Sequence, residues 1–268
     1  MLRCDALTGV TTRRVRRQKG ETDQVSENVM SLHRKDTGRK QVLGRLRCLG
    51  PLLMTMALPG YALAAPVNVG DAALNATRYH DSGAYERDFN SVLQDAEDWI
   101  RLRSSHVVKP AVILDIDETS LSNWPEIAAN QFAYFREGQC ASLPKGPCGV
   151  EAWEQSARAE AFPETLSLYN MAQQHGVSLF FVTGRYERER NDTARNLESA
   201  GYHGWVKLVL RPEGSHTPSA SDYKSAERAR IEQEGYHIIA NIGDQPSDLA
   251  GGHAERGFLL PNPFYRVP

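Results

Sequence analysis

Long hydrophobic runs are scarce in this 268-residue chain. The one extended apolar stretch, residues 48–64, is interrupted by Pro51, Pro59 and Gly60, and it is shorter than the roughly 20 apolar residues that a membrane-spanning helix needs. Internal repeats and low-complexity tracts are missing from residues 65–268 as well. With 41% hydrophobic and 24% charged residues, the composition is that of a soluble globular protein. This excludes a multi-span membrane protein, a collagen and a mostly disordered chain.

A basic surplus is missing from most of the chain. Residues 1–64 hold 12 of the 31 Lys and Arg side chains and 5 of the 33 Asp and Glu side chains. Residues 65–268 are left with 19 basic and 28 acidic side chains, a net charge of −9. Affinity for a nucleic-acid backbone needs clustered Lys and Arg, so this acidic body argues against a nucleic-acid polymer as a partner.

The first 64 residues resemble an N-terminal extension followed by a secretory signal peptide. A positively charged flank, residues 39–47, precedes the apolar stretch, which ends in Ala62-Leu63-Ala64, the small-x-small pattern that signal peptidase cleaves. We expect cleavage near Ala64/Ala65, no stable membrane insertion afterwards, and a periplasmic or secreted protein. The alternative is an uncleaved membrane anchor. Met30 is a second candidate for the start of translation, beside Met1.

Cysteine is also scarce. Two of the four cysteines, Cys4 and Cys48, fall in the segment that we expect to be removed, which leaves Cys140 and Cys148. In an oxidising compartment two thiols this close in sequence can close a small loop. A zinc site is the competing interpretation, but it needs about four ligands, and no second cysteine pair or His-x-x-His motif lies nearby. We therefore favour a disulfide with a structural role.

Short apolar runs alternate with segments of helical periodicity in residues 65–268. This alternation predicts right-handed crossovers and a doubly wound parallel sheet, an α/β fold. Residues 124–162, rich in aromatics, proline and glycine, do not fit the alternation, and we expect a small cap inserted after the first core strand. Strands are predicted at 111–114, 177–182, 206–210 and 237–242, with 257–260 as a candidate fifth, and helices at 72–103, 163–175, 191–200 and 221–234.

Polar side chains follow three of the predicted strands, and a lysine lies in the helix before the fourth strand. The carboxyl ends of parallel strands share one edge of a sheet, so we expect these side chains to converge there. Several carboxylates together repel one another unless a cation compensates, and carboxylate oxygens without His or Cys favour Mg²⁺. The residues are Asp115 and Asp117 after the first strand, Thr183, Gly184 and Arg185 after the second, Lys224, and Asp244 and Asp248 after the fourth.

Four segments resemble the motifs of the haloacid dehalogenase (HAD) superfamily, in the form carried by its subfamily IIIB acid phosphatases. The resemblance spans about residues 72–260 and implies a HAD-like Rossmannoid core in a phosphatase domain of residues 65–268, with N-terminal helices before it. The segments are Leu114-Asp-Ile-Asp-Glu-Thr-Ser-Leu-Ser-Asn123, Phe181-Val-Thr-Gly-Arg185, Tyr223-Lys-Ser225 and Ile242-Gly-Asp-Gln-Pro-Ser-Asp-Leu249, and Tyr79-His-Asp-Ser-Gly-Ala-Tyr85 is similar as well.

The chemistry of these side chains agrees with the resemblance. A carboxylate such as Asp115 can attack phosphorus and form an aspartyl-phosphate, and Asp117, two residues further on, is placed to protonate the leaving group and then activate water. Dehalogenases of the superfamily lack this second aspartate. The resemblance further implies Mg²⁺ bound by Asp115, by the backbone carbonyl of Asp117 and by Asp244, with Asp248 in support directly or through water, and phosphoryl oxygens bound by Thr183, Gly184 and Lys224.

We therefore expect an exported, Mg²⁺-dependent acid phosphatase that hydrolyses small phosphomonoesters, with nucleoside monophosphates as one class. A phosphotransferase using the same intermediate and a non-catalytic metal- or phosphate-binding storage-type protein are alternatives. A receiver-type signalling module is disfavoured by the export signal, the large insert and Asp117. Aromatic residues of the insert either stack on a nucleobase or form the insert's own core: Trp124, Phe132, Tyr134, Phe135 and Trp153. No oligomeric state is predicted.

Overall fold

The computed structural model describes residues 66–214 and 219–267. The predicted signal peptide, its cleavage site and the alternative start at Met30 lie outside the described residues. Within these residues, no helix is both long enough and apolar enough to cross a membrane.

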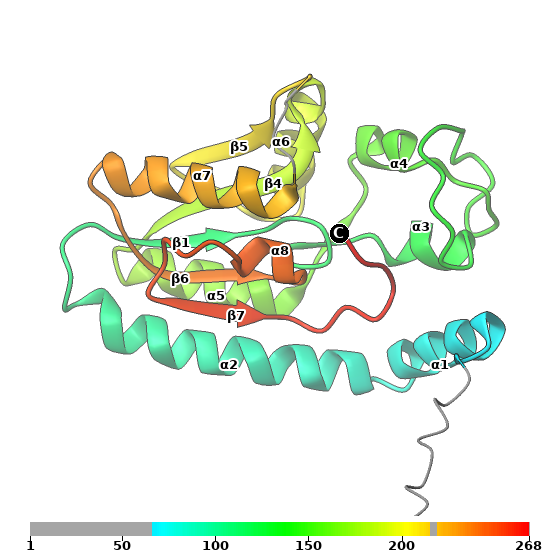
Figure 1. Ribbon diagram of the computed structural model, residues 1–268, viewed down its shortest axis with the longest axis horizontal. Helices are drawn as coiled ribbons and strands as arrows, with labels where there is room; N and C mark the ends of the chain where they lie inside the picture. The colour runs from blue at the N-terminus through cyan, green and yellow to red at the C-terminus, as the bar shows by residue number, and fades with distance from the viewer. Residues whose placement is uncertain (1–65, 215–218, 268) are drawn as a thin grey trace, which may run out of the picture. The chain divides into compact units, whose positions relative to one another are not determined.

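A five-stranded parallel sheet forms the centre of the fold (Figure 1). The strand order is β5-β4-β1-β6-β7, so the chain enters at the central strand and winds outward in both directions. This confirms the predicted doubly wound α/β fold, including the candidate fifth strand. The strands are β1 (Pro110–Leu114), β4 (Ser178–Tyr186), β5 (Lys207–Arg211), β6 (His237–Gly243) and β7 (Arg256–Leu259).

The first core strand is buried on both faces, as its unbroken apolar run predicts. Val112 and Leu114 belong to one hydrophobic cluster, and Ala111 and Ile113 belong to the other. None of these four side chains is more than 2% exposed. Successive residues of a strand point to opposite faces, so a short run of consecutive apolar residues supplies both layers of the core.

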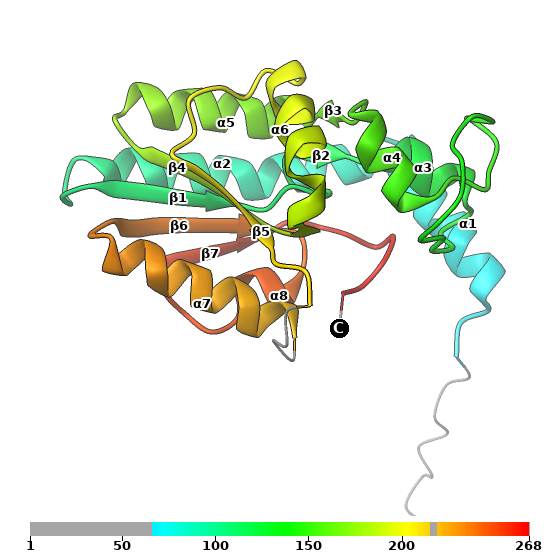
Figure 2. The same cartoon turned by 90° about the horizontal axis from the view of Figure 1, so that it is seen from above.

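Helices cover both faces of the sheet (Figure 2). Ser219 caps α7, because its hydroxyl accepts a hydrogen bond from the backbone N–H of Asp222 at 3.1 Å. Pro163 begins α5, where a proline is tolerated because the first N–H groups of a helix have no partner within it. One face carries α2 (Ala84–Ser104), α5 (Pro163–Gln174) and α6 (Arg190–Ser199), and the other carries α7 (Ala220–Gln233) and α8 (Pro246–Leu249).

Two elements differ from the prediction. The periodicity of residues 72–103 predicts one helix, but the chain forms α1 (Val69–Asp81) and α2, separated at Gly83, which has a φ of 72°. Glycine adopts this left-handed conformation without the steric cost of a Cβ, so the chain turns there. The second core strand was predicted to end at residue 182, but β4 continues to Tyr186, so Thr183, Gly184 and Arg185 are strand residues.

The chain between β1 and α5 forms a separate layer beyond the carboxyl ends of the strands (Figure 1). This insert contains α3 (Trp124–Ala129), α4 (Val150–Ser156) and an antiparallel pair of short strands, β2 (Leu121–Ser122) and β3 (Glu160–Ala161). A disulfide between Cys140 and Cys148 closes the loop before α4. This confirms the predicted disulfide and contradicts the zinc interpretation.

Candidate active site

The carboxyl ends of β1, β4 and β6 open into one cavity of about 590 Å³. The insert forms part of its wall, and residues 264–267 at the end of the chain form another part. Thr183 is fully buried and does not line this cavity. The other predicted site residues do line it: Asp115, Asp117, Gly184, Lys224, Asp244 and Asp248.

Three carboxylates and one ammonium group form a buried cluster on the sheet side of the cavity. Asp115, Asp244 and Asp248 each place one carboxylate oxygen so that all three lie within 4.8 Å of one another. Lys224 reaches in from α7, and its Nζ donates to Asp115 Oδ1 at 2.5 Å and to Asp248 Oδ1 at 2.6 Å. The cluster therefore holds more negative than positive charge.

The electrostatics of this cluster favour a bound cation. Burial raises the pKa of Asp115 well above its ordinary value, and Asp248 and Asp244 add to that effect while Lys224 opposes it. Burial, with the charge of Asp248, raises the pKa of Asp244 to about 6. Burial alone would lower the pKa of Lys224, but Asp115 and Asp248 outweigh it and raise that pKa. Buried, mutually repelling carboxylate oxygens fit a hard divalent cation such as Mg²⁺.

Local sequence places two of these carboxylates. Gly243 ends β6, and a Cβ at that position would lie 2.4 Å from Asp248 Oδ2, so only glycine lets Asp248 fold back against the strand. The backbone N–H of Gln245 donates to Asp248 Oδ2 at 2.9 Å. The side-chain amides of Gln245 and Asn262 each donate to Asp244 Oδ2 at 2.6 Å. Asn262 was missed by the sequence analysis, because it lies beyond the last motif.

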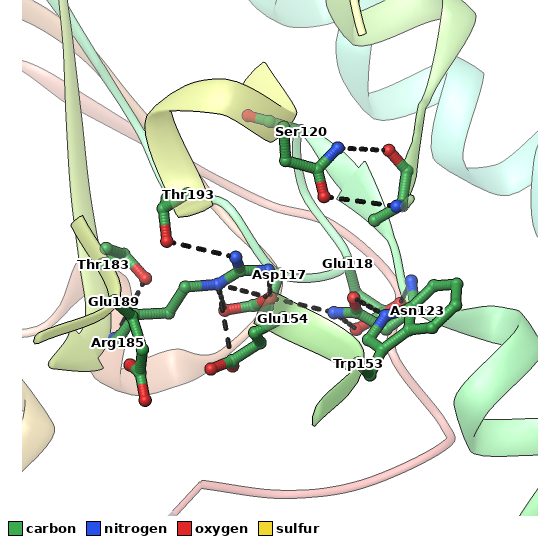
Figure 3. A network of polar contacts seen from close by, with 12 residues as sticks. Asp117, Glu118, Ser120, Asn123, Trp153, Glu154, Thr183, Arg185, Glu189 and Thr193 are labelled. Atoms are coloured by element: carbon green, nitrogen blue, oxygen red, sulfur yellow. Dashed lines mark hydrogen bonds and ion pairs between the residues drawn. The ribbon is translucent and has the colours of Figure 1, made fainter. Parts of the chain in front are cut away.

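Asp117 lines the cavity, but its side chain is not part of the carboxylate cluster. It lies between Arg185 and Asn123 (Figure 3). Arg185 Nη2 donates to Asp117 Oδ1 at 2.6 Å, and Asn123 Nδ2 donates to the same oxygen at 2.8 Å. Burial raises the pKa of Asp117, but the charge and hydrogen bonds of Arg185, with the hydrogen bond of Asn123, outweigh it and hold that pKa below its ordinary value. Neither Arg185 nor Asn123 had a predicted role in the chemistry, although both lie within the quoted motifs.

Glu118 is a second buried acid that the sequence analysis did not single out. It accepts hydrogen bonds from the backbone N–H of Asn123 at 2.6 Å and from the Tyr265 hydroxyl at 3.1 Å. Burial, with the charge of Asp117, raises the pKa of Glu118 to about 8. Tyr265, like Asn262, comes from the C-terminal residues, and no motif or periodicity marks it.

The cavity wall at Gly184 has room for an anionic group. Gly184 is exposed, and apart from its two chain neighbours no atom of the described residues lies within 4 Å of the position that its Cβ would take. Thr183 lies directly behind it, with its Oγ1 accepting the backbone N–H of Arg185 at 3.2 Å. Ser247 also lines the cavity, and its buried hydroxyl has no hydrogen-bond partner among the described residues.

The aromatic residues of the insert have different roles. Trp124 stacks on His80 of α1 with ring centroids 3.6 Å apart, and Trp153 is 4% exposed, so the packing of the insert accounts for Trp124 and for the burial of Trp153. Phe132 and Tyr134 line the cavity, and Tyr134 is 74% exposed. Phe135 is exposed and does not line the cavity.

An Asp-x-Asp pair, a buried lysine and a second acidic pair, all at the carboxyl edge of a doubly wound parallel sheet, define an α/β enzyme of the phosphatase class. The family model described as "HAD superfamily, subfamily IIIB (Acid phosphatase)" matches residues 64–268. The chain belongs to this family of phosphoric monoester hydrolases, which confirms the resemblance seen in its motifs.

Related proteins from plants agree with this assignment, and a bacterial structure shares the fold. The stem 28 kDa glycoprotein of Glycine max is 35% identical over 203 residues, which are 74% of this chain and 76% of that one. Acid phosphatase 1 of Solanum lycopersicum is 38% identical over 156 residues, which are 58% of each chain. The class C acid phosphatase from Bacillus anthracis, 21% identical, shares the fold with a TM-score of 0.59 over 75% of this chain and 87% of its own.

Proposed function

We propose that this protein is an exported, Mg²⁺-dependent phosphomonoesterase that works through an aspartyl-phosphate on Asp115. The observation that carries the proposal is the buried cluster in which Asp115, Asp244 and Asp248 offer oxygens within 4.8 Å of one another beside Lys224, open to a cavity of about 590 Å³. Asp115, Asp244 and the backbone carbonyl of Asp117 would hold the ion, with Asp248 beside them. When bound, Mg²⁺ supplies positive charge that offsets the repulsion between a carboxylate nucleophile and an anionic phosphate.

The reaction consists of two displacements at phosphorus, and residues of the chain carry out both. An oxygen of Asp115 attacks phosphorus while the bond to the leaving oxygen breaks, and Asp117 gives that oxygen its proton. Asp117 then takes a proton from water, which attacks phosphorus and releases the carboxylate of Asp115. Lys224 and the Gly184 amide bind the phosphoryl oxygens, where charge accumulates in the transition state. The Thr183 hydroxyl would have to turn into the cavity to join them, because it is fully buried and accepts the backbone N–H of Arg185.

The environment of Asp117 suits both parts of its role. Arg185 favours the carboxylate form of Asp117, which is the form that activates water. A bound phosphate adds negative charge near Asp117 and shifts the balance toward the protonated acid, which is the form that the first displacement needs.

Small phosphomonoesters are the proposed substrates, and nucleoside monophosphates are one class of them. Phe132 and Tyr134 line the cavity together with the carboxylates. A nucleobase stacked on such a ring gains about 1–3 kcal/mol. Export is supported by the disulfide between Cys140 and Cys148, a bond that persists in oxidising compartments.

Phosphate release by the purified full chain tests the catalytic proposal, with a nucleoside monophosphate and a sugar phosphate as substrates. We expect turnover with Mg²⁺, none with EDTA, and a loss on the order of 10³-fold or more in Asp115→Asn. A folded, Mg²⁺-loaded protein without turnover from acid to neutral pH would refute it. Added alcohol acceptors would reveal a phosphotransferase, since phosphorylated alcohol would then replace part of the free phosphate.

A non-catalytic role is the second candidate, because Vegetative storage protein 1 of Arabidopsis thaliana is 34% identical over 157 residues. Stoichiometric binding of Mg²⁺ or phosphate without turnover would favour it. Export is tested separately, by sequencing the N-terminus of protein recovered from outside the cytoplasm. We expect it to begin at Ala65, and a mature protein that retains the first 64 residues would contradict the signal peptide.

A further inference from the structure

Two adjacent residues of the insert helix α4, Trp153 and Glu154, each contact a different partner of Asp117 (Figure 3). Their backbone lies in the insert, whereas Asp117 follows the first core strand. The short helix therefore connects the insert to the residue proposed to transfer protons.

The first connection runs through Asn123. The indole N–H of Trp153 donates to Asn123 Oδ1 at 2.8 Å, and Asn123 Nδ2 donates to Asp117 Oδ1 at 2.8 Å and to Glu118 Oε2 at 3.1 Å. An indole can only donate and an ionised carboxylate can only accept. The amide oxygen of Asn123 must therefore face Trp153, and its amide nitrogen must face Asp117. Without the indole N–H, the amide loses the contact that fixes its orientation toward Asp117.

The second connection runs through Arg185. Its guanidinium donates to both oxygens of Asp117, with Nε 3.2 Å from each, and its Nη1 donates to Thr193 Oγ1 at 3.3 Å. Glu154 Oε1 lies 3.7 Å from Arg185 Nε. The Arg185 side chain is 1% exposed, so protein groups rather than water fix its orientation. Glu154 is the contribution of the insert to that arrangement.

The helix that carries these two residues is itself held at both ends. Before it, the side-chain amide of Asn130 bonds both the N–H and the carbonyl of Cys148, at 2.8 Å each, beside the disulfide. In its last turn, the carbonyl of Gln155 accepts a hydrogen bond from Arg195 of α6 at 2.8 Å. Because the backbone of α4 is held in place, the Trp153 and Glu154 side chains start from fixed positions.

We propose that Trp153 and Glu154 are positioning residues that hold the Asp117 carboxylate in the orientation needed for proton transfer, acting through Asn123 and Arg185. The inference rests on the proposed function, because it concerns the residue proposed as general acid and base. It assigns the insert a part in the chemical step in addition to covering the site.

The test compares two leaving groups. An alkyl phosphate releases a basic alkoxide that needs a proton in the transition state, whereas p-nitrophenyl phosphate releases a stable phenolate that needs none. The readout is kcat/KM, which reports the first displacement and excludes the shared hydrolysis of the intermediate. Trp153→Phe removes the indole N–H and keeps an aromatic ring, Glu154→Ala removes the carboxylate, and Asp117→Asn sets the full size of the effect.

We expect Trp153→Phe and Glu154→Ala to lower kcat/KM for the alkyl phosphate by about 10-fold or more, and that for p-nitrophenyl phosphate by less than about 3-fold, because general acid catalysis contributes roughly 10²–10⁴-fold where a leaving group needs it. Glu154→Gln, which keeps the shape and one acceptor oxygen, should recover part of the loss. Trp205→Phe, beside the amino end of β5, and Glu137→Ala, exposed on the insert, are the matched controls and should leave the ratio unchanged.

Equal losses with both substrates, or no loss, in the two insert variants would overturn the inference if Asp117→Asn still discriminates between the leaving groups. An inactive wild type, or an Asp117→Asn variant that does not discriminate, would overturn the proposed role of Asp117 and the inference with it. Thermal unfolding of each variant separates a folding defect from a catalytic one. The two insert variants are independent, so failure of one to fold leaves the other decisive.

Discussion

Arg228 is the side chain whose replacement should destabilise the protein most clearly. It lies in α7 and is 1% exposed. Its guanidinium donates to three backbone carbonyls in and after α8: to Asp248 at 2.6 Å, to Gly252 at 2.9 Å, and to Ala250. Burial lowers the pKa of Arg228, but an arginine still carries its charge at any pH of interest. These three hydrogen bonds fix the backbone that carries Asp248 into the carboxylate cluster.

The size of the effect follows from these contacts. Arg228→Met keeps much of the side-chain volume but removes three hydrogen bonds, at about 1 kcal/mol each, so we expect a loss of about 3 kcal/mol in the free energy of unfolding. Of the three carbonyls, that of Asp248 keeps a second donor, Asn241 Nδ2 at 2.8 Å. For a domain of this size that loss corresponds to a fall of roughly 6–12 °C in the melting temperature. Displacement of Asp248 should also weaken Mg²⁺ binding by about 10-fold or more.

Thermal unfolding and calorimetric Mg²⁺ titration of Arg228→Met measure both effects. Arg230→Met is the matched control, because Arg230 lies on the same helix and its side chain is 63% exposed, so solvent screens its pair with Glu227, a residue that is itself mostly buried. Such a pair is worth at most about 1 kcal/mol, so the control should unfold close to the wild type. If Arg228→Met unfolds no earlier than Arg230→Met, the reasoning about buried carbonyl acceptors is refuted.

Three further changes have defined outcomes. Replacing Cys140 and Cys148 by alanine should lower the free energy of unfolding by about 2.5 kcal/mol in a denaturant titration, because the bond spans a sequence separation of 8. The hydrogen bond from Arg103 lowers the pKa of Glu255 to about 2, so this pair stabilises the fold above pH 4.5 and the effect fades as the pH falls toward 2. Allowing for solvent screening, we expect this pair to contribute about 1 kcal/mol to the free energy of unfolding. Unfolding of the wild type and of Glu255→Gln, measured at about pH 6 and about pH 3, tests this, because the variant should lack the contribution. Gly243→Ala should weaken Mg²⁺ binding at least about 10-fold in calorimetry, since the added Cβ overlaps the neighbouring aspartate.

Each of these outcomes has its own control. A reductant added to the wild type should reproduce the cysteine replacement, and an unchanged unfolding curve would contradict a stabilising disulfide. A Glu255→Gln variant that keeps the full pH dependence would show that other groups cause it. Gly70→Ala, in α1, meets only the side-chain oxygen of Asn68, so it should bind Mg²⁺ like the wild type; equal affinity in Gly243→Ala would contradict the steric argument.

Much of the fold could be predicted from the sequence, because the signals for its core elements are local. A run such as residues 111–114 has no polar residue to face solvent, so it favours a strand buried on both faces, and its short length favours a strand over a helix. Loss of the helical period at Gly83 was harder to foresee, since a single glycine in a long amphipathic pattern is also tolerated inside a helix. Before the left-handed turn at Gly83, α1 packs against the insert, where His80 stacks on Trp124.

The site was predictable where its residues follow strand ends. Asp115, Lys224, Asp244 and Asp248 come together because parallel strands end at one edge, which is a rule of topology rather than of this sequence. Arg185 lies in a quoted motif, yet no spacing along the chain indicates that its guanidinium turns toward an aspartate 68 residues earlier.

The sequence by itself determined the parallel sheet, which of its strands end in site residues, the disulfide and the acidic residues at the carboxyl edge. Only the tertiary structure decided which groups hold those acids in place. Asn262 and Tyr265 reach Asp244 and Glu118 from the far end of the chain, and Trp153 reaches Asn123 from the insert. Motifs and periodicity record interactions between near neighbours, whereas contacts across 18, 147 and 30 residues depend on how separately formed layers dock against one another.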